Sequence, residues 1–247
     1  MNDDDLRFGG LARLYGAGGL QRLLRANVCV IGLGGVGSWA AEALARSGIG
    51  HITLVDLDDV CLSNVNRQLH ALDGAIGRPK VEVMAERIRA IHPGCQVRAM
   101  AEFFTETTAG QILENRFDHV LDAIDQVTNK CLLIARCCQD KIPIVCAGGA
   151  GGRRNPAAIR VADLAHSSYD PLLQQVRKKL REEHEFARDP KILFGVPCVF
   201  STELAVAPPE GSAGRVTCDN GYGTAAFVTG TFGFMAASCV VSKIAAG

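Results

Sequence analysis

The chain has 247 residues, 48% of them hydrophobic, so it can bury a large core without a disulfide or a structural metal. Its 26 Lys and Arg residues balance its 26 Asp and Glu residues, so net charge gives no argument for a nucleic-acid partner and none against a local basic patch. The ten cysteines form no C-x-x-C pair, which disfavours a four-thiolate zinc site, and the acidic start is unlike a signal peptide. We therefore expect one domain over residues 1–247, with reduced thiols and a cytoplasmic location.

Short apolar runs alternate with helical patterns through residues 1–150, which indicates a Rossmann-like α/β fold: a mainly parallel sheet with helices on both faces. The patterns predict strands at residues 28–31, 52–55, 96–100, 120–123 and 142–146, and helices at 38–47, 79–93 and 127–142. Beyond residue 150 a C-terminal extension begins, with strands expected at 159–161 and 198–202. The charged stretch 174–191 fits either a solvated helix or a mobile arm.

Residues 221–242 carry no charge, and a helix of that length extends about 33 Å, enough to cross a bilayer core. Four glycines and several Ser and Thr residues interrupt the segment. We expect a buried core helix, and the membrane alternative stays open at this point.

A glycine-rich loop, GLGGVG, follows the first expected strand directly. Such glycines allow a tight turn, a close approach of the backbone to phosphate, and phosphate binding at the positive end of the next helix. The expected phosphate-binding positions are Gly32, Gly34, Gly35 and Gly37. Asp56 ends the second strand, where a carboxylate can accept hydrogen bonds from ribose hydroxyls; the alternative is a surface turn with Asp58 and Asp59.

The next segment distinguishes a triphosphate from a nicotinamide cofactor. Arg67 stands near the phosphate end of the same crevice, where a dehydrogenase needs little positive charge, and its guanidinium can grip phosphate oxygens bidentately. Lys80, at a helix start, offers a mobile point charge for a second phosphate. The competing interpretations are an ordinary salt bridge for Arg67 and a solvated first-turn side chain for Lys80.

Two aspartates lie at the end of a later strand, on the edge where open parallel sheets hold ligands. Asp125 is the candidate Mg²⁺ ligand, because Mg²⁺ takes one or two carboxylates together with phosphate oxygens and water. Asp122 is expected to be structural.

With the glycine loop, Asp56, the NRQ run at residues 66–68, Lys80 and Asp125 in this order, the sequence resembles the adenylyltransferase superfamily related to ubiquitin-activating enzymes. Further stretches at residues 7–16, 148–152, 198–203 and 218–223 resemble one branch of it, the tRNA threonylcarbamoyladenosine dehydratases. The lack of C-x-x-C pairs fits this branch, since the sulfur-carrier-activating relatives typically carry a zinc site built from them.

The resemblance implies a reaction and its cofactors. ATP with Mg²⁺ converts the threonine carboxylate of a modified adenosine in the tRNA anticodon arm into an acyl-adenylate, and a ureido nitrogen then closes a ring as AMP leaves. The net change is the loss of water. Within this resemblance Arg67, Lys80 and Asp125 carry the catalysis, and Asp58, Asn66 and Gln68 join the nucleotide contacts.

The resemblance also implies a homodimer in which an N-terminal arginine reaches the partner's ATP. Arg7 and Arg13 are both available, and Arg13 is the one assigned here. The C-terminal part, residues 151–247, is expected to face the substrate and contribute to the dimer. Whether a monovalent cation orders the glycine-rich loops, and whether a sulfur-transfer protein is a further partner, the sequence leaves open.

For tRNA the candidate contacts are basic residues after position 150: Arg153, Arg154, Arg177, Lys178, Lys179 and Arg181. The acidic neighbours of the second group equally fit a solvated helix with internal ion pairs. Cys198 and Cys218 fit reactive thiols less well than small buried side chains.

Two other functions stay open on the sequence alone. One is an adenylyltransferase that activates the C-terminal Gly-Gly of a sulfur-carrier protein. The other is a nucleotide-dependent oxidoreductase or a redox-sensing binding module.

Overall fold

The structure, a computed structural model, describes residues 3–206 and 222–247 and contains a seven-stranded sheet in the order β3-β2-β1-β4-β5-β7-β6. Neighbouring strands are parallel except β6 and β7, which are antiparallel. The strands are β1 (Asn27–Ile31), β2 (His51–Val55), β3 (Gln96–Met100), β4 (His119–Asp122), β5 (Ile144–Ala147), β6 (Ile159–Asp163) and β7 (Pro197–Ser201).

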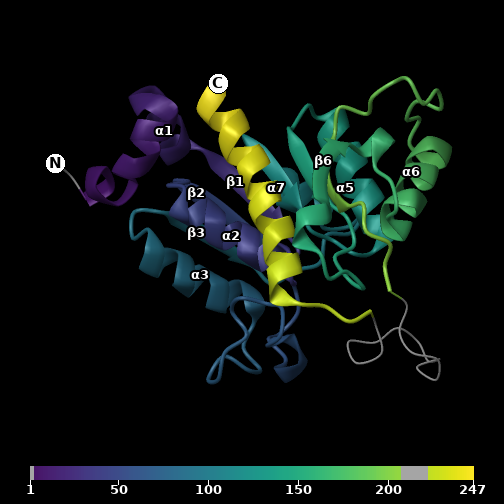
Figure 1. The fold of residues 1–247 in the computed structure, drawn as a ribbon. Coiled ribbons are helices and arrows are strands. Elements are labelled where there is room, and N and C mark those ends of the chain that lie inside the picture. Colours follow the sequence, from purple (N-terminus) through teal and green to yellow (C-terminus); the bar gives the residue numbers. More distant parts are fainter. Residues whose placement is uncertain (1–2, 207–221) are drawn as a thin grey trace.

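Helices cover both faces of the sheet, which confirms the expected α/β fold (Figure 1). Helices α2, α3 and α7 pack on one face, and α4, α5 and α6 pack on the other. The helices are α1 (Asp3–Arg25), α2 (Gly37–Arg46), α3 (Lys80–Ile91), α4 (Ala109–Leu113), α5 (Val127–Gln139), α6 (Pro171–Glu183) and α7 (Ala226–Ala246). Short 3₁₀ turns η1 (Leu62–Asn64), η2 (Pro156–Ala158) and η3 (Leu164–His166) lie in the connections.

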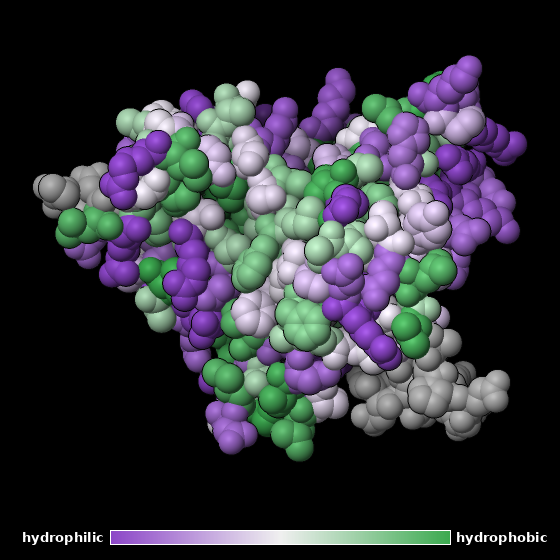
Figure 2. All heavy atoms as spheres, in the orientation of Figure 1, coloured by the Kyte–Doolittle hydropathy of each residue, from purple (hydrophilic) through white to green (hydrophobic). Residues whose placement is uncertain are grey.

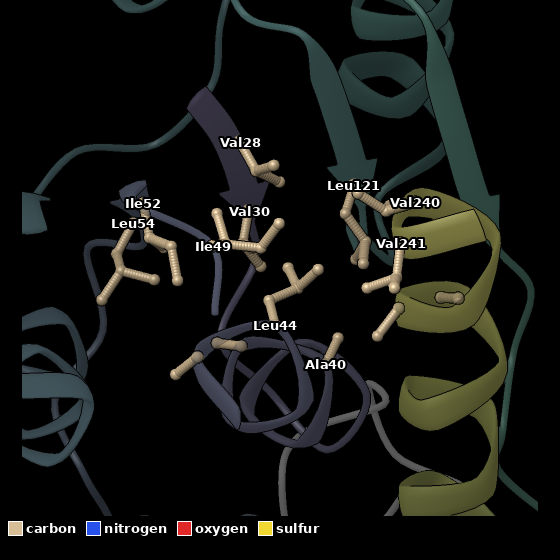
Figure 3. Close-up of a cluster of buried hydrophobic side chains, with 14 of the residues drawn as sticks. Val28, Val30, Ala40, Leu44, Ile49, Ile52, Leu54, Leu121, Val240 and Val241 are labelled. Atoms are coloured by element: carbon tan, nitrogen blue, oxygen red, sulfur yellow. The ribbon is translucent and has the colours of Figure 1, made fainter. Parts of the chain in front are cut away.

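The alternation of side chains along β1 divides the core in two. Val28 and Val30 face the layer of α2 and α7, whereas Cys29 and Ile31 face the layer of α5. Figure 3 shows the first cluster, with Leu44 of α2 directed toward these valines. Because both faces of the central strands are buried, these strands are mostly apolar instead of alternating regularly with polar residues.

Helix α7 contains most of the long uncharged segment, and it is the one helix of the described residues that is long and apolar enough to cross a membrane. Val228, Phe232 and Val240 are fully buried against the sheet and α2. A Cβ on Gly233 would lie 2.6 Å from the carbonyl oxygen of Val36, so this glycine permits the close packing of α7 on the start of α2. The prediction of a core helix is confirmed.

The short helix α4 was not predicted from the sequence, and two longer segments also differ from the expectation. The first is α1, which the sequence did not predict because glycines are frequent in it; the helix is broken at Gly16, where φ is 76°. The second is the charged stretch, which is an ordered helix only as far as Glu183. This helix begins at Pro171, is capped by Asp170, and buries three apolar residues, Leu173, Val176 and Leu180. It is therefore an amphipathic packed helix and not a mobile arm.

Candidate functional site: a nucleotide crevice at the carboxyl edge of the sheet

The crevice lies where the strand order reverses. β1 lies between β2 and β4, and Ile31 at the end of β1 pairs with Asp122 at the end of β4. The loops that leave β1, β2 and β4 therefore emerge together at one sheet edge, the position at which open α/β sheets bind ligands.

The glycine loop is shaped by contacts that exclude side chains. Gly32 has a φ of 89°, and a Cβ there would lie 2.8 Å from the carbonyl oxygen of Ala123, in the turn after β4. A Cβ on Gly37 would lie 1.8 Å from the carbonyl oxygen of Gly32. By contrast, nothing lies within 4 Å of the Cβ position of Gly34, so the backbone there is open to a ligand. The loop leads directly into the start of α2, where free amides favour phosphate.

Asp56 holds this loop in place. Its Oδ2 accepts a hydrogen bond from the Leu33 amide at 2.6 Å, and its Oδ1 accepts one from the Asp58 amide at 2.9 Å. Burial raises the pKa of Asp56, and the nearby charge of Lys80 opposes that rise. The surface-turn alternative is therefore wrong for Asp56. Each carboxylate oxygen keeps acceptor capacity for a ribose hydroxyl.

Lys80 lies at the start of α3 and is buried, with its Nζ 2.7 Å from Asp58 Oδ2 and 3.9 Å from Asp56 Oδ1. The alternative of a solvated first-turn side chain is therefore wrong, and the point charge expected for a phosphate is fixed by two carboxylates instead of mobile. Burial, and then the charge of Lys80, lower the pKa of His70 to about 4, so this imidazole is neutral beside the ammonium.

Arg67 lies along the glycine loop. A Cβ on Gly35 would lie 3.6 Å from Arg67 Cγ, and the guanidinium Nη1 donates to the Ser63 carbonyl at 2.6 Å. The Arg67 carbonyl accepts hydrogen bonds from Trp39 Nε1 at 3.0 Å and from Thr229 Oγ1 at 3.1 Å, so α2 and α7 both fix its backbone. The guanidinium is bonded to neutral groups and forms no ion pair with a described residue, so it keeps its charge for a phosphate.

The neighbours of Arg67 differ in exposure. Asn66 is exposed and its Nδ2 donates to the Thr224 carbonyl at 3.0 Å, which ties this segment to the approach to α7. Gln68 is buried, and its Oε1 has no hydrogen-bond partner among the described residues.

Asp125 is exposed in the turn after β4, and the structure shows no hydrogen bond or ion pair for its carboxylate within the described part of the chain. A carboxylate with unoccupied oxygens at the ligand edge fits the chemistry of a Mg²⁺ ligand. The described residues contain no cluster of three or more metal-binding side chains.

The turn that carries Asp125 is clamped from beneath. Asp122 Oδ1 accepts a hydrogen bond from the Ile124 amide at 3.0 Å, and Lys130 Nζ donates to the Ile124 carbonyl at 2.9 Å. Lys130 Nζ and Asp122 Oδ2 are 2.8 Å apart, and both side chains are 0% exposed. Burial raises the pKa of Asp122 against the opposing charge of Lys130. The structural role expected for Asp122 is confirmed.

Arg13 does not reach the crevice of its own chain. Its helix, α1, packs at the far end of α7, where Gly19 approaches Ala245, whereas the crevice borders the start of α7 at Thr229. The two points are separated by roughly 24 Å of helix at 1.5 Å per residue. Arg7 is engaged elsewhere, since its Nη1 donates to the Ile91 carbonyl at 3.2 Å, whereas Arg13 is exposed.

Two further expectations are corrected or settled by burial. Arg153 cannot contact RNA, because its guanidinium is buried and bonded to the carbonyls of Gly149 and Tyr169 and to Asp170. Cys198 is fully buried, and burial raises the pKa of its thiol well above the ordinary value, so the less reactive interpretation is confirmed. Cys218 lies outside the described residues.

Three residues of the site could not be recognised from the sequence. Trp39 and Thr229 position Arg67 by donating hydrogen bonds to its backbone carbonyl. In the sequence they are distinguished only by nearby glycines, which pack closely in the structure. Lys130 lies in a helical pattern where a lysine is normally solvated. Its proximity to two aspartates was the available signal.

Comparison with known proteins gives one family and a consistent set of relatives. Residues 10–245 match the model of the ThiF family. The chain is 48% identical to a tRNA threonylcarbamoyladenosine dehydratase of Haemophilus influenzae over 248 residues, which covers 99% of this chain and 95% of that protein. A crystal structure of the Escherichia coli tRNA N6-threonylcarbamoyladenosine dehydratase in complex with ATP superposes with a TM-score of 0.91 at 48% identity, covering 99% of this chain and 96% of that one.

A more distant relative matches a smaller share of this chain. The Escherichia coli sulfur carrier protein ThiS adenylyltransferase is 37% identical over 136 residues, which is 54% of this chain and 53% of that protein. Similarity to the dehydratases thus extends over the C-terminal part, whereas similarity to this sulfur-carrier enzyme covers about half of the chain.

Proposed function

This chain belongs to the ThiF family, and from its near full-length similarity to the dehydratases we infer that it is an ATP-dependent enzyme that cyclises threonylcarbamoyladenosine in tRNA. The observation that carries this proposal is the extent of the match, which covers 99% of this chain for the dehydratase and 54% for the sulfur-carrier enzyme. The crevice supports it, because fixed cations lie where a polyphosphate would bind.

We assign the activation step to Arg67 and Lys80. The threonine carboxylate attacks the α-phosphate of ATP, an acyl-adenylate forms, and pyrophosphate leaves. Such a displacement requires mainly positioning and neutralisation of charge. Arg67 offers a planar fork of donors beside the glycine loop, and Lys80, held between Asp56 and Asp58, offers a point charge. Asp56 orients the nucleotide through the ribose.

Ring closure needs fewer catalytic groups from the protein than the activation step does. A ureido nitrogen of the same nucleoside attacks the activated carbonyl, AMP leaves with the carboxylate oxygen that joined it, and the proton of the nitrogen is released. A well-oriented intramolecular nucleophile reaches an effective molarity on the order of 10⁵ M. The chain therefore needs to hold the nucleoside still and exclude water.

Asp125 is the residue that would hold Mg²⁺, and a bound Mg²⁺ supplies charge neutralisation on the phosphates. The Lys130–Asp122 pair beneath it holds the backbone of Ile124 and so positions the next residue, Asp125. Asn66 and Gln68 are proposed nucleotide contacts at the same edge, and the unpartnered Oε1 of Gln68 leaves an acceptor for a ligand donor.

The enzyme is proposed to act in the cytoplasm as a homodimer in which Arg13 serves the partner's crevice. The position of α1 supports this proposal, because Arg13 is exposed and its helix packs at the end of α7 far from the crevice of the same chain. In this proposal residues 1–150 bind the nucleotide and residues 151–247 face the tRNA and contribute to the dimer. A monovalent cation at the glycine-rich loops and a sulfur-transfer partner are further proposals that leave the reaction itself unchanged.

The test is release of AMP and pyrophosphate from ATP and Mg²⁺ in the presence of threonylcarbamoylated tRNA. Release is expected with this tRNA, absent with tRNA that lacks the modification, and abolished by Arg67→Ala but not by the surface control Arg116→Ala. Release that requires a carrier protein ending in Gly-Gly instead of tRNA would assign the chain to the sulfur-carrier enzymes.

A further inference from the structure

One side of α6 and the loop after it form a basic groove of about 770 Å³. Four cationic side chains face a single carboxylate, although the whole chain has no net charge. Hydrophilic side chains gather over α6 in Figure 2. The groove is lined by Gln174, Gln175, Arg177, Lys178, Arg181, Glu182 and Arg188.

Two of the cations are held rigidly by groups that do not neutralise them. Arg177 Nη1 donates to Ser167 Oγ at 2.5 Å. Arg181 Nε donates to the Ala187 carbonyl at 3.2 Å, and its guanidinium lies 5.2 Å from the centre of the Phe194 ring. Burial, and then the charge of Arg181, lower the pKa of Arg177, so the two guanidinium groups repel each other in the absence of an anion. Fixed like charges of this kind favour an anionic ligand with little ordering cost.

The other two cations are exposed. Lys178 lies 4.0 Å from Glu182, and both side chains are largely in solvent, so this pair contributes little and leaves the ammonium available. Arg188 is exposed in the loop after α6. Lys179, which the sequence grouped with these residues, is instead paired with Glu183 at 2.7 Å and does not line the groove.

The groove begins near the carboxyl edge of the sheet, where the nucleotide crevice lies. Asp170 caps α6, and its Oδ2 accepts a hydrogen bond from the Gly149 amide at 2.9 Å, just after β5 ends. The carboxyl end of β5 lies on the same sheet edge as the glycine loop, because β1, β4 and β5 are parallel neighbours. From this point α6 extends for about 20 Å, at 1.5 Å per residue, while its apolar face packs in the same core as α5.

We propose that the α6 groove binds the sugar-phosphate backbone of the tRNA anticodon arm while the modified base lies in the crevice. The inference rests on the proposed function for the identity of the RNA. Residues 174–182 span about 12 Å of helix, enough to contact more than one successive phosphate of a strand. Guanidinium groups match phosphate geometry, and the excess of positive charge favours an anionic strand over a protein partner, because the core of a protein interface is depleted of charged residues.

The test compares two double variants that change the net charge equally. Lys178→Glu with Arg188→Glu alters the exposed cations of the groove, and Arg25→Glu with Arg116→Glu alters the opposite edge of the sheet, where Asn27 begins β1. Binding of a fluorescent anticodon-arm RNA is measured by anisotropy over a series of salt concentrations. ATP affinity, measured by thermal shift, verifies that both variants are folded.

The groove variant is expected to bind the RNA at least about tenfold more weakly, with the slope of log affinity against log salt shallower by roughly 1.4 to 1.8, the value for two lost phosphate contacts. The edge variant is expected to bind as the wild type does. Wild-type affinity and slope in the groove variant, or equal losses in both variants, overturn the groove as the RNA site. If instead the groove variant behaves as expected but the wild type does not cyclise threonylcarbamoylated tRNA, the proposed function fails and the groove stands as an RNA-binding surface.

Discussion

Replacing Lys130 by Met tests the buried clamp beneath the crevice. The substitution removes the only cation that pairs with Asp122 in the described part of the chain, and both side chains are 0% exposed. Loss of one partner of a buried ion pair costs about 3–5 kcal/mol, because the remaining charge has neither water nor a counter-ion. For a domain of this size such a loss lowers Tm by roughly 6–20 °C. The volume of the side chain is largely kept, so a cavity contributes little.

The loss in Lys130→Met should depend on pH in a defined direction. Burial already raises the pKa of Asp122 in the wild type, and the variant lacks the ammonium that opposes this rise. A carboxyl whose pKa is higher in the folded state than in the unfolded state destabilises the fold progressively as the pH rises from the unfolded value toward the folded one. The free energy of unfolding of the variant, relative to the wild type, is therefore expected to be lowest at pH 8 and to recover toward pH 5.

Urea denaturation at pH 5 and pH 8 measures this, with Asp122→Asn/Lys130→Met as the matched control that removes the charge as well as its partner. The control is expected to be clearly more stable than Lys130→Met at pH 8, because replacing the whole pair leaves no unpaired charge. A loss below about 1 kcal/mol in Lys130→Met, or a loss that is the same at both pH values, would refute the assignment of the pair as a clamp.

Three further substitutions probe the crevice. Asp125→Ala is expected to lower kcat by roughly 100-fold or more with little change in ATP affinity, since a metal ligand acts most where charge develops; equal losses in both quantities would assign Asp125 to ground-state binding. Arg67→Lys is expected to lower kcat/KM by roughly 10- to 100-fold, because about 1.5–3 kcal/mol of charge-assisted hydrogen bonding is lost with the planar fork; near-wild-type turnover would remove Arg67 from the site. Gly37→Ala is expected to weaken ATP binding and lower Tm, because its Cβ would meet the Gly32 carbonyl oxygen at 1.8 Å, whereas Gly110→Ala meets nothing within 4 Å and should leave both unchanged or slightly raise Tm; similar behaviour of the two variants would contradict the packing of the loop.

The parts of the fold that the sequence predicted are those governed by local periodicity. The buried parallel strands and the helices after them carried clear apolar patterns, and the glycine loop and Asp56 followed from their position at strand ends. Helix α1 was not predicted, because glycines such as Gly19 lower its intrinsic helix propensity. These glycines allow the close packing on α7 that stabilises the helix. Periodicity carries no information on such long-range contacts.

The site was predictable as a set of residue types but not as a set of partners. The sequence predicted Lys80 to be a free cation and Arg153 to be an RNA contact, because a charged side chain is usually solvated. In the structure both side chains are buried, Lys80 beside Asp58 and Arg153 beside Asp170. The same reasoning missed Lys130. In each case the deciding quantity is the burial of a charge with its partner, which depends on the tertiary arrangement.

The most direct measurement of the central claim follows the fate of an oxygen atom. Threonylcarbamoylated tRNA is prepared with ¹⁸O in the threonine carboxylate and incubated with the enzyme, ATP and Mg²⁺, and the products are analysed by mass spectrometry. If the carboxylate attacks the α-phosphate, the AMP released carries one ¹⁸O atom and the cyclised nucleoside keeps the other. Unlabelled AMP, or label in inorganic phosphate with ADP as the other product, would contradict an acyl-adenylate formed in this crevice.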